Sequence, residues 1–514
     1  MTKYATALLL LLLPAITFAQ KKDKSAVKAA TTITAEDMQK HLYIIASKDM
    51  EGRDTPSPGQ EKAAVYIENY FKSLGLTPGN NGSYRQYFPL YKDSMTAASL
   101  ELNGTALKIN DDYLPFQNNY AGELRFSEVV YAGYGISDGD KRNDYANLNV
   151  TGKLVLITDG TPSDYKPSTG GFNSPGSTNG KLNAALSRGA SAVLFIQSNF
   201  PRKAGSQTAN WSMNGFKSSQ SIFGFNVSTT VAATILGADA ASLSEKIKAN
   251  AIEKKAYPAE IALQYAKTTL QTKVSNVVAT IEGTDKKDEY VVLSAHYDHV
   301  GKRPDGTIYY GADDDGSGTT SILELAEAFT TAKKAGKGPR RTILFITVCG
   351  EEKGLWGSNY YSNHPLFPLE KTSVDLNIDM VGRIGSEYLK DKDSTNYVYM
   401  IGDDKLSTDL APIADMINKT YSGIKLDRKY NDINDPNRFY YRSDHYNFAQ
   451  KGVPIIFYFN GTHADYHKPT DTPDKINYPL MAKRGQYIFY TAWEMANRND
   501  MLKRDLQLDK PKGF

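Results

Sequence analysis

The chain contains a single cysteine, Cys349, among its 514 residues. One thiol cannot form an intrachain disulfide, and it cannot build a zinc site that needs several thiolates. The charges nearly balance, with 60 Lys and Arg against 57 Asp and Glu and a net charge of +3. Because nucleic-acid-binding surfaces are usually strongly basic, this balance argues against a nucleic-acid partner.

Long apolar runs are also scarce, and the one near the N-terminus is too short to span a bilayer comfortably. It covers residues 7–19, follows Lys3 and ends in Thr17-Phe18-Ala19, which is the pattern of a cleaved signal peptide over residues 1–19. We therefore expect no stable membrane span, export to the periplasm or outside the cell, and a flexible lead-in over residues 20–34. An uncleaved anchor or a disordered tail is the alternative.

The remaining composition, 40% hydrophobic and 23% charged, is that of a globular protein whose length favours two domains. Residues 35–96 show helical spacing, and residues 97–266 show short strand-like runs between loops rich in Gly, Ser and Asn. Residues 267–505 alternate strands, loops and helices, and residues 506–514 form a tail. We predict an α/β fold: a mixed, mostly parallel sheet flanked by helices, interrupted by a smaller β-rich insert.

Four strand-length apolar runs in the C-terminal half are each followed by residues that bind metals or transfer protons. Residues 290–295 precede His296, residues 343–348 precede Glu351 and Glu352, residues 374–378 precede Asp379, and residues 454–459 precede His463 and His467. Ligands bind at the carboxyl ends of the strands in open α/β sheets. We therefore expect these side chains to meet at one edge of the sheet.

An acidic turn supplies a fifth donor. Residues 311–318 read GADDDGSG, and three consecutive carboxylates repel one another unless a cation lies among them. A solvated helix N-terminus or a calcium loop would also explain this turn. The same half of the chain holds three short histidine clusters, which favour zinc over calcium: His296 with His299, His445, and His463 with His467.

The number of donors fits two zinc ions about 3.5–4 Å apart. His296, Asp379, Glu352 and His467, with one bridging Asp from the turn, give each ion an imidazole and carboxylates and leave a position for water. Glu351 is then free to act as a general base. Taken alone, the Glu351-Glu352 pair is more typical of a helix N-terminus stabilised by the helix dipole.

Five motifs, in this order, resemble the co-catalytic dizinc aminopeptidases, a family related to secreted leucyl aminopeptidases and to glutamate carboxypeptidase. They are SAHYDH (294–299), GADDDGSG (311–318), GEEKG (350–354), NIDM (377–380) and YHKPTDT (466–472). The resemblance covers about residues 276–476, and no ligand position departs from the family pattern. It implies two Zn²⁺ per chain and a zinc-peptidase fold.

The resemblance also implies a role for each matching residue. His296 and Asp379 would bind one zinc ion, Glu352 and His467 the other, and Asp314 would bridge them. Asp298 would orient His296, Glu351 would be the general base, and Tyr466 would donate to the oxyanion. Candidate substrate-binding residues, for which structural roles are equally open, are Asp444, His445, His463 and Arg442.

The insert resembles a protease-associated domain through residues 129–136, 144–146, 152–156 and 181–195.

We expect an exported aminopeptidase acting on peptides with a free N-terminus, because an acidic cluster suits a free α-amino group. Three arginines keep a carboxypeptidase open, since they could bind a substrate carboxylate: Arg383, Arg438 and Arg442. A glutaminyl cyclase with one zinc ion and a non-catalytic binding protein are further alternatives. The sequence indicates no oligomeric state.

Overall fold

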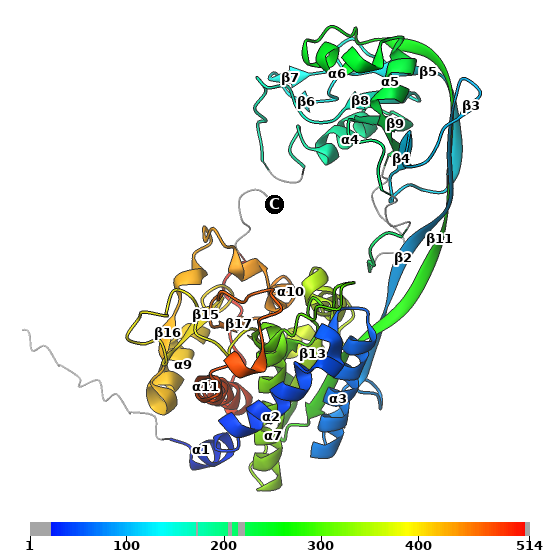
Figure 1. Cartoon of the computed structure of the whole chain (residues 1–514). Helices are drawn as coiled ribbons and strands as arrows, with labels where there is room; N and C mark the ends of the chain where they lie inside the picture. Colours follow the sequence, from blue (N-terminus) through cyan, green and yellow to red (C-terminus); the bar gives the residue numbers. More distant parts are fainter. Residues whose placement is uncertain (1–21, 171–172, 204–207, 214–221, 509–514) are drawn as a thin grey trace, which may run out of the picture. The chain divides into compact units, whose positions relative to one another are not determined.

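The computed structural model describes residues 22–170, 173–203, 208–213 and 222–508 (Figure 1). The predicted signal peptide lies outside these residues. The chain divides into two compact units, one formed by the chain up to Phe88 with Lys273 onward, the other by Pro89–Thr272. The predicted insert boundaries, 97 and 266, fall inside two long strands, β2 (Arg85–Leu102) and β11 (Ala256–Ile281).

The first unit is built on a mixed sheet with the strand order β16-β15-β17-β14-β12-β13-β11. The four strands from β17 to β13 run parallel, whereas β15 and β11 run antiparallel to their neighbours β17 and β13. This arrangement confirms the predicted mixed, mostly parallel sheet. Its other strands are β1 (Thr77–Pro78), β12 (Lys286–His296), β13 (Arg341–Val348), β14 (Thr372–Ile378), β15 (Tyr397–Ile401), β16 (Lys425–Asp427) and β17 (Ile455–Phe459).

The parallel strands are apolar throughout because both faces of the sheet are covered. Every residue of β13, β14 and β17 is buried, as expected for parallel strands between helical layers. Side chains alternate between the faces. Ile346 therefore belongs to a core cluster with Tyr361 and Phe448, whereas its neighbour Phe345 lies against Phe329.

Helices cover both faces of this sheet. α7 and α11 pack on one face, with α1, α2 and α3 against them, and α8 and α10 pack against β13, β14 and β17 on the other. The bounds are α1 (Lys24–Ala30), α2 (Ala35–Ile45), α3 (Pro58–Leu74), α7 (Gly318–Lys334), α8 (Trp356–Asn363), α9 (Leu410–Ile417), α10 (His445–Ala449) and α11 (Tyr478–Asn497). Short helical turns are η1 (Lys48–Arg53), η2 (Ala312–Ser317), η3 (Glu351–Lys353), η4 (Leu369–Lys371), η5 (Asn418–Ser422), η6 (Lys429–Asn431), η7 (Phe439–Tyr441) and η8 (Pro473–Lys475).

The segment expected to be a flexible lead-in is instead ordered from Asp23 onward. The Asp23 side chain caps α1 by accepting from the backbone N–H of Ser25, and it also accepts from the indole of Trp493. Three buried alanines, Ala26, Ala29 and Ala30, give α1 an apolar face that packs on α7 and α11. Their small side chains allow the helices to pack closely. The segment is rich in charged residues, so its composition does not reveal this apolar face.

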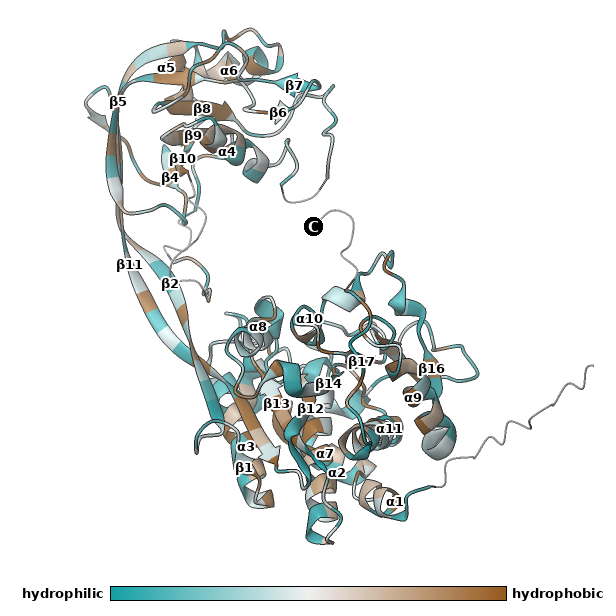
Figure 2. Ribbon diagram, turned by 180° about the vertical axis from the view of Figure 1, so that it is seen from behind, coloured by the Kyte–Doolittle hydropathy of each residue, from teal (hydrophilic) through white to brown (hydrophobic). Residues whose placement is uncertain are grey.

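In the second unit the strand order is β11-β5-β8-β9-β10-β4, and β11 also pairs with β13 of the first unit. β5, β8, β9 and β10 are parallel, and Figure 2 colours much of β8 and β9 as hydrophobic. α4 packs on one face, and α5 and α6 on the other. Its elements besides β2 and β11 are β3 (Thr105–Ala106), β4 (Tyr113–Pro115), β5 (Gly122–Tyr131), β6 (Ser137–Asp138), β7 (Arg142–Asn143), β8 (Leu154–Thr158), β9 (Ala192–Gln197), β10 (Phe223–Ser228), α4 (Thr178–Ser187), α5 (Thr229–Leu236) and α6 (Ala240–Lys248).

Among the described residues, no helix combines the length and the apolar character that crossing a bilayer requires.

Candidate metal centre

The parallel strands bring the predicted donors to the same edge of the sheet. β12 ends at His296, and Asp379 directly follows β14. Glu351 and Glu352 lie in η3, just after β13, and His467 lies in the loop after β17. Asp314 comes from η2, the turn that leads into α7. Because these strands are parallel neighbours, residues far apart in the sequence meet at their carboxyl ends.

A first group of donors surrounds the imidazole of His296. Its Nε2 lies 3.3 Å from Asp314 Oδ1, 3.6 Å from Asp379 Oδ1 and 3.9 Å from Glu351 Oε2. His296, Asp315 and Asp379 form one of two groups of described residues with the spacing to hold a metal ion.

A second group lies on the other side of Asp314. His467 Nε2 is 2.9 Å from Asp314 Oδ2 and 3.2 Å from Glu352 Oε2. His299, Asp314 and Glu352 form the second group with metal-holding spacing. The two oxygens of Asp314 thus face different imidazoles, which is the arrangement of a bridging carboxylate.

The donor atoms fit a pair of cations, because several are buried without a hydrogen bond. His296 Nε2, Asp314 Oδ2 and Glu352 Oε1 are among them. Buried polar atoms normally have a hydrogen-bond partner, and donor atoms without one that point at a common position suit a bound ion. The cluster also attracts positive charge: although burial favours the neutral ring, Asp314 and Glu352 raise the pKa of His467 to about 10. Imidazole and carboxylate ligands of this kind suit zinc.

Hydrogen bonds fix the carboxylates of Asp379 and Asp315 and the backbone of the acidic turn. The Ser443 hydroxyl donates to Asp379 Oδ2 at 2.6 Å, and Asp471 Oδ2 accepts from the backbone N–H of Asp313 and Asp314 at 2.9 and 3.3 Å. Asp315 Oδ1 accepts from the backbone N–H of Gly318 at 2.8 Å. Such outer contacts orient metal ligands.

Asp298 lies beside His296, but its carboxylate makes a different contact from the expected one. His296 Nδ1 is 3.1 Å from the backbone carbonyl of Asp298 and 3.7 Å from its carboxylate. The carboxylate accepts instead from the backbone N–H of Glu351 at 3.2 Å. Asp298 therefore orients His296 through its main chain and holds the Glu351 turn through its side chain.

The carboxyl group of Glu351 lies beside the donor cluster, 3.9 Å from His296 Nε2. Burial raises the pKa of Glu351 well above its usual range, helped by Glu352 and Asp379 and opposed by His296. A general base works best with a pKa near the working pH, and a carboxylate reaches that range only when its pKa is raised. Glu351 also lines the pocket described next.

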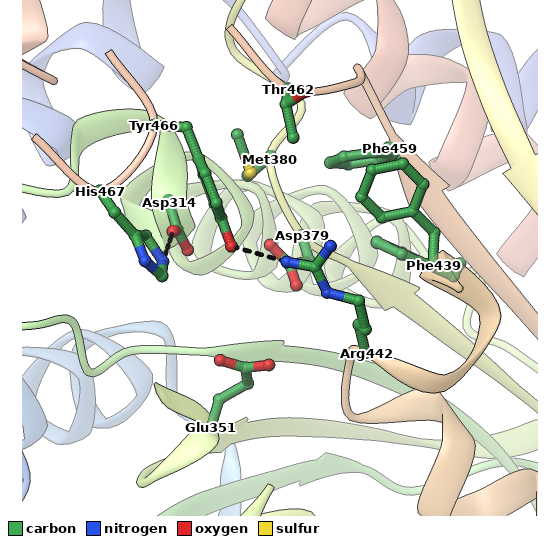
Figure 3. Close-up of a pocket in the computed structure, with 11 residues that line it drawn as sticks. Asp314, Glu351, Asp379, Met380, Phe439, Arg442, Phe459, Thr462, Tyr466 and His467 are labelled. Carbon is green, nitrogen blue, oxygen red and sulfur yellow. Dashed lines mark hydrogen bonds and ion pairs between the residues drawn. The ribbon is translucent and has the colours of Figure 1, made fainter. Parts of the chain in front are cut away.

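A pocket opens over the donor cluster (Figure 3). Asp314, Glu351, Asp379 and His467 line its polar side, and Met380, Phe439, Phe457 and Phe459 line its apolar side. Tyr466 and Arg442 stand between these sides, with Arg442 Nη2 donating to the Tyr466 hydroxyl at 3.2 Å. Burial and the neighbouring carboxylates raise the pKa of Tyr466, so its hydroxyl stays protonated as a donor.

Of the four candidate substrate-binding residues, only Arg442 lines this pocket. Asp444 is buried and accepts from the Ser358 hydroxyl at 2.5 Å, and His445 Nε2 lies 2.7 Å from the carbonyl of Tyr440. His463 Nε2 lies 3.1 Å from Asp313 Oδ2, behind the donor cluster. These three residues are buried and do not line the pocket.

His299 belongs to the donor cluster, although sequence reasoning gave it no role. It lies three residues after His296, and its Nδ1 is 2.9 Å from Glu352 Oε1. The SAHYDH motif contains the residue, but a motif does not show which loop side chains turn toward a site.

The part of the chain that holds the donor cluster is similar to known proteins. Residues 276–492 match the model of Peptidase family M28. The matched residues include all five predicted metal-ligand positions.

Curated relatives match over short segments. A probable glutamate carboxypeptidase AMP1 from Arabidopsis thaliana is 37% identical over 108 residues, 21% of this chain and 14% of that protein. A probable zinc metalloprotease from Pyricularia oryzae is 28% identical over 271 residues, 45% of this chain and 52% of that protein. The chain thus spans less than two thirds of the length of these relatives.

Solved structures are also similar to this chain over most of its length. An aminopeptidase from Aneurinibacillus sp. strain AM-1 aligns over 94% of this chain and 100% of its own, with a TM-score of 0.52 and 20% identity. That likeness establishes the shared fold.

Proposed function

We propose that the chain is a dizinc metallo-exopeptidase, most specifically an aminopeptidase that hydrolyses the N-terminal peptide bond of peptides. The observation that carries the proposal is the position of Asp314, whose two carboxylate oxygens face His296 and His467 at 3.3 and 2.9 Å. Two metal positions that share one carboxylate are typical of co-catalytic metal sites.

In this proposal, His296 and Asp379 would hold one zinc ion, Glu352 and His467 would hold the other, and Asp314 would contribute a carboxylate oxygen to each. Bound zinc supplies Lewis acidity toward the scissile carbonyl and makes a water molecule more acidic. The remaining chemistry belongs to side chains of the chain.

Glu351 takes the proton of the attacking water and passes it to the nitrogen of the departing amine. The Tyr466 hydroxyl donates a hydrogen bond to the oxygen that becomes negative in the transition state. Arg442 holds that hydroxyl in place by donating to its oxygen, and the guanidinium also lies 5.2 Å from the Phe439 ring centroid. The apolar side of the pocket favours a substrate with an apolar N-terminal side chain.

The acidic cluster favours an amino group over a carboxylate as the anchored end of the substrate. Arg383 is already paired with Asp465 at 2.9 Å and with Asp471 at 3.6 Å, so its charge is satisfied within the chain. The second candidate is a carboxypeptidase. Arg442 favours it, because this exposed arginine lines the pocket, and one matched relative is described as a probable glutamate carboxypeptidase.

Two further parts of the proposal concern the rest of the chain. The apolar run over residues 7–19 supports export through a signal peptide to the periplasm or beyond the cell. Motifs such as VVYAGYGI (129–136) support a protease-associated domain in the second unit, where a parallel sheet with helices on both faces forms an independent core.

The test is the variant Glu351→Gln in the full chain. We expect it to bind two zinc ions, as the wild type does, and to lose hydrolysis of aminoacyl reporter substrates by several orders of magnitude. Wild-type turnover by this variant would refute the assigned role. A panel with free and acetylated N-termini, carboxy-terminal reporters and N-terminal Gln peptides separates aminopeptidase from carboxypeptidase and glutaminyl cyclase.

A further inference from the structure

His299 is a buried imidazole for which the proposed reaction has no use. Its side chain is fully buried, and neither ring nitrogen makes a hydrogen bond. Burying an imidazole in this state is costly, because its nitrogens lose their hydrogen bonds to water. The ring therefore needs a partner other than the hydrogen-bonding groups around it.

The nearest charged atoms belong to the second donor group. His299 Nδ1 lies 2.9 Å from Glu352 Oε1 and 3.9 Å from Asp314 Oδ2. His467 Nε2 approaches the same two carboxylates, at 3.2 and 2.9 Å. The two imidazoles thus stand around one pair of carboxylates, with ring centroids 5.7 Å apart.

The short distance between His299 and Glu352 is not accompanied by hydrogen-bond alignment. Nδ1 and Oε1 are 2.9 Å apart, yet both atoms are without a hydrogen-bond partner. Two ligands of one ion behave in this way, because their lone pairs point at the ion and not at each other. Tetrahedral zinc ligands at 2.0–2.2 Å stand about 3.3–3.6 Å apart, and the distances among these donors fall on both sides of that range.

The surrounding chain holds the ring in this place. The backbone N–H of His299 donates to the carbonyl of Arg53 at 3.3 Å. A Cβ on Gly311 would lie 2.4 Å from His299 Cγ, so only glycine leaves room for the ring there. Gly311 also has a φ of +58°, which favours glycine. The first glycine of the acidic turn therefore makes space for His299.

We propose that His299 binds, through Nδ1, the same metal ion as Glu352 and His467. This inference rests on the proposed dizinc centre and adds a ligand to the five that the motifs supply. It makes the two metal positions unequal. The position beside Glu352 has two imidazoles, whereas the position beside Asp379 has one, so the first should retain its ion more strongly.

The first test measures metal affinity by chelator competition in the full chain. The variants are His299→Ala and His299→Gln, and the control is His364→Ala, which removes an exposed imidazole that stacks on Tyr360. We expect both His299 variants to bind one of the two zinc ions at least about tenfold more weakly than the wild type, while the control is unchanged. Unaltered affinity in His299→Ala overturns the proposal. So does full rescue by His299→Gln, whose amide N–H can replace a hydrogen bond to Glu352 but not an imidazole ligand.

The second test is a crystal structure of the zinc-loaded chain. The proposal predicts His299 Nδ1 at about 2.0–2.1 Å from one zinc ion. Two bound ions with Nδ1 farther than about 3 Å from both overturn the His299 assignment and leave the dizinc centre intact. A wild-type chain that binds fewer than two ions overturns the dizinc centre, and with it the assignment.

Discussion

His467 Nε2 lies 2.9 Å from Oδ2 of Asp314, while the other oxygen of the same carboxylate faces His296 at 3.3 Å. One acidic side chain therefore joins two donor groups that come from different strands of the sheet. If Asp314 is shared by two ions, its removal affects both, whereas removal of any other ligand affects mainly one.

Asp314→Ala is therefore expected to lose both zinc ions. Without the shared carboxylate, neither group keeps its donors, and the remaining acids repel one another. Elemental analysis after dialysis should give less than one zinc ion per chain, whereas the exposed control Asp305→Ala should keep the wild-type content. Retention of two ions by Asp314→Ala would exclude a bridging role.

Tyr466→Phe tests the oxyanion donor. The variant keeps the aromatic ring, which stacks on His467 with centroids 4.0 Å apart, and removes only the hydroxyl. We expect kcat to fall by about 10²–10³ with little change in KM, since the hydrogen bond strengthens in the transition state. A kcat within threefold of the wild type, at unchanged zinc content, would contradict this role.

Arg53→Met tests the support beneath the site. The buried guanidinium donates to four backbone carbonyls, those of Tyr297, Ile45, Tyr310 and Gly311, at 2.7–2.9 Å. Leaving buried carbonyls unpaired should lower the free energy of unfolding by about 3–5 kcal/mol. Chemical denaturation measures the loss, and Lys40→Met, on an exposed side chain of α2, should change it by less than about 0.5 kcal/mol. A loss below about 1 kcal/mol in Arg53→Met would contradict the account.

The raised pKa of the buried Asp375 carboxyl should make the stability of the chain depend on pH. Burial within the sheet raises the pKa of Asp375 to about 8, although the Ser294 hydroxyl donates to its Oδ1 at 2.7 Å. The folded chain therefore keeps this proton between about pH 4 and pH 8 while the unfolded chain releases it. The free energy of unfolding falls as the pH rises through that window, by up to about 5 kcal/mol.

Asp375→Asn removes this dependence because the amide does not titrate. In metal-free protein, we expect the Tm of the variant to exceed that of the wild type by more at pH 9 than at pH 5. The control Asp305→Asn should show the same small difference at both values. An equal Tm difference for Asp375→Asn at pH 5 and pH 9 would contradict the raised pKa.

The sheet and its donor-bearing edge were predictable, because fully buried parallel strands leave continuous apolar runs in the sequence. β13 and β14 are examples, each followed by acidic residues. The motifs later in the chain also come directly after parallel strands, so the sequence places their residues at the same edge of the sheet. The roles of these residues in binding zinc remain a prediction that metal analysis tests.

Other features depend on contacts that no local pattern reveals. Arg53 lies far from the motifs, yet its guanidinium holds the backbone next to His296 and the acidic turn. Asp444 and His445 resemble pocket residues in sequence, but their side chains turn toward Ser358 and the Tyr440 carbonyl. The direction of a side chain in a loop follows from tertiary packing. Sequence spacing alone therefore does not show that His299 points toward the donor cluster while these two residues point away from the pocket.

Zinc content of the wild-type chain tests the central claim most directly. The full chain, saturated with zinc and freed of excess metal, is analysed for elemental zinc against protein concentration. The account predicts two zinc ions per chain, and a value of one or none would contradict a pair of ions bridged by Asp314.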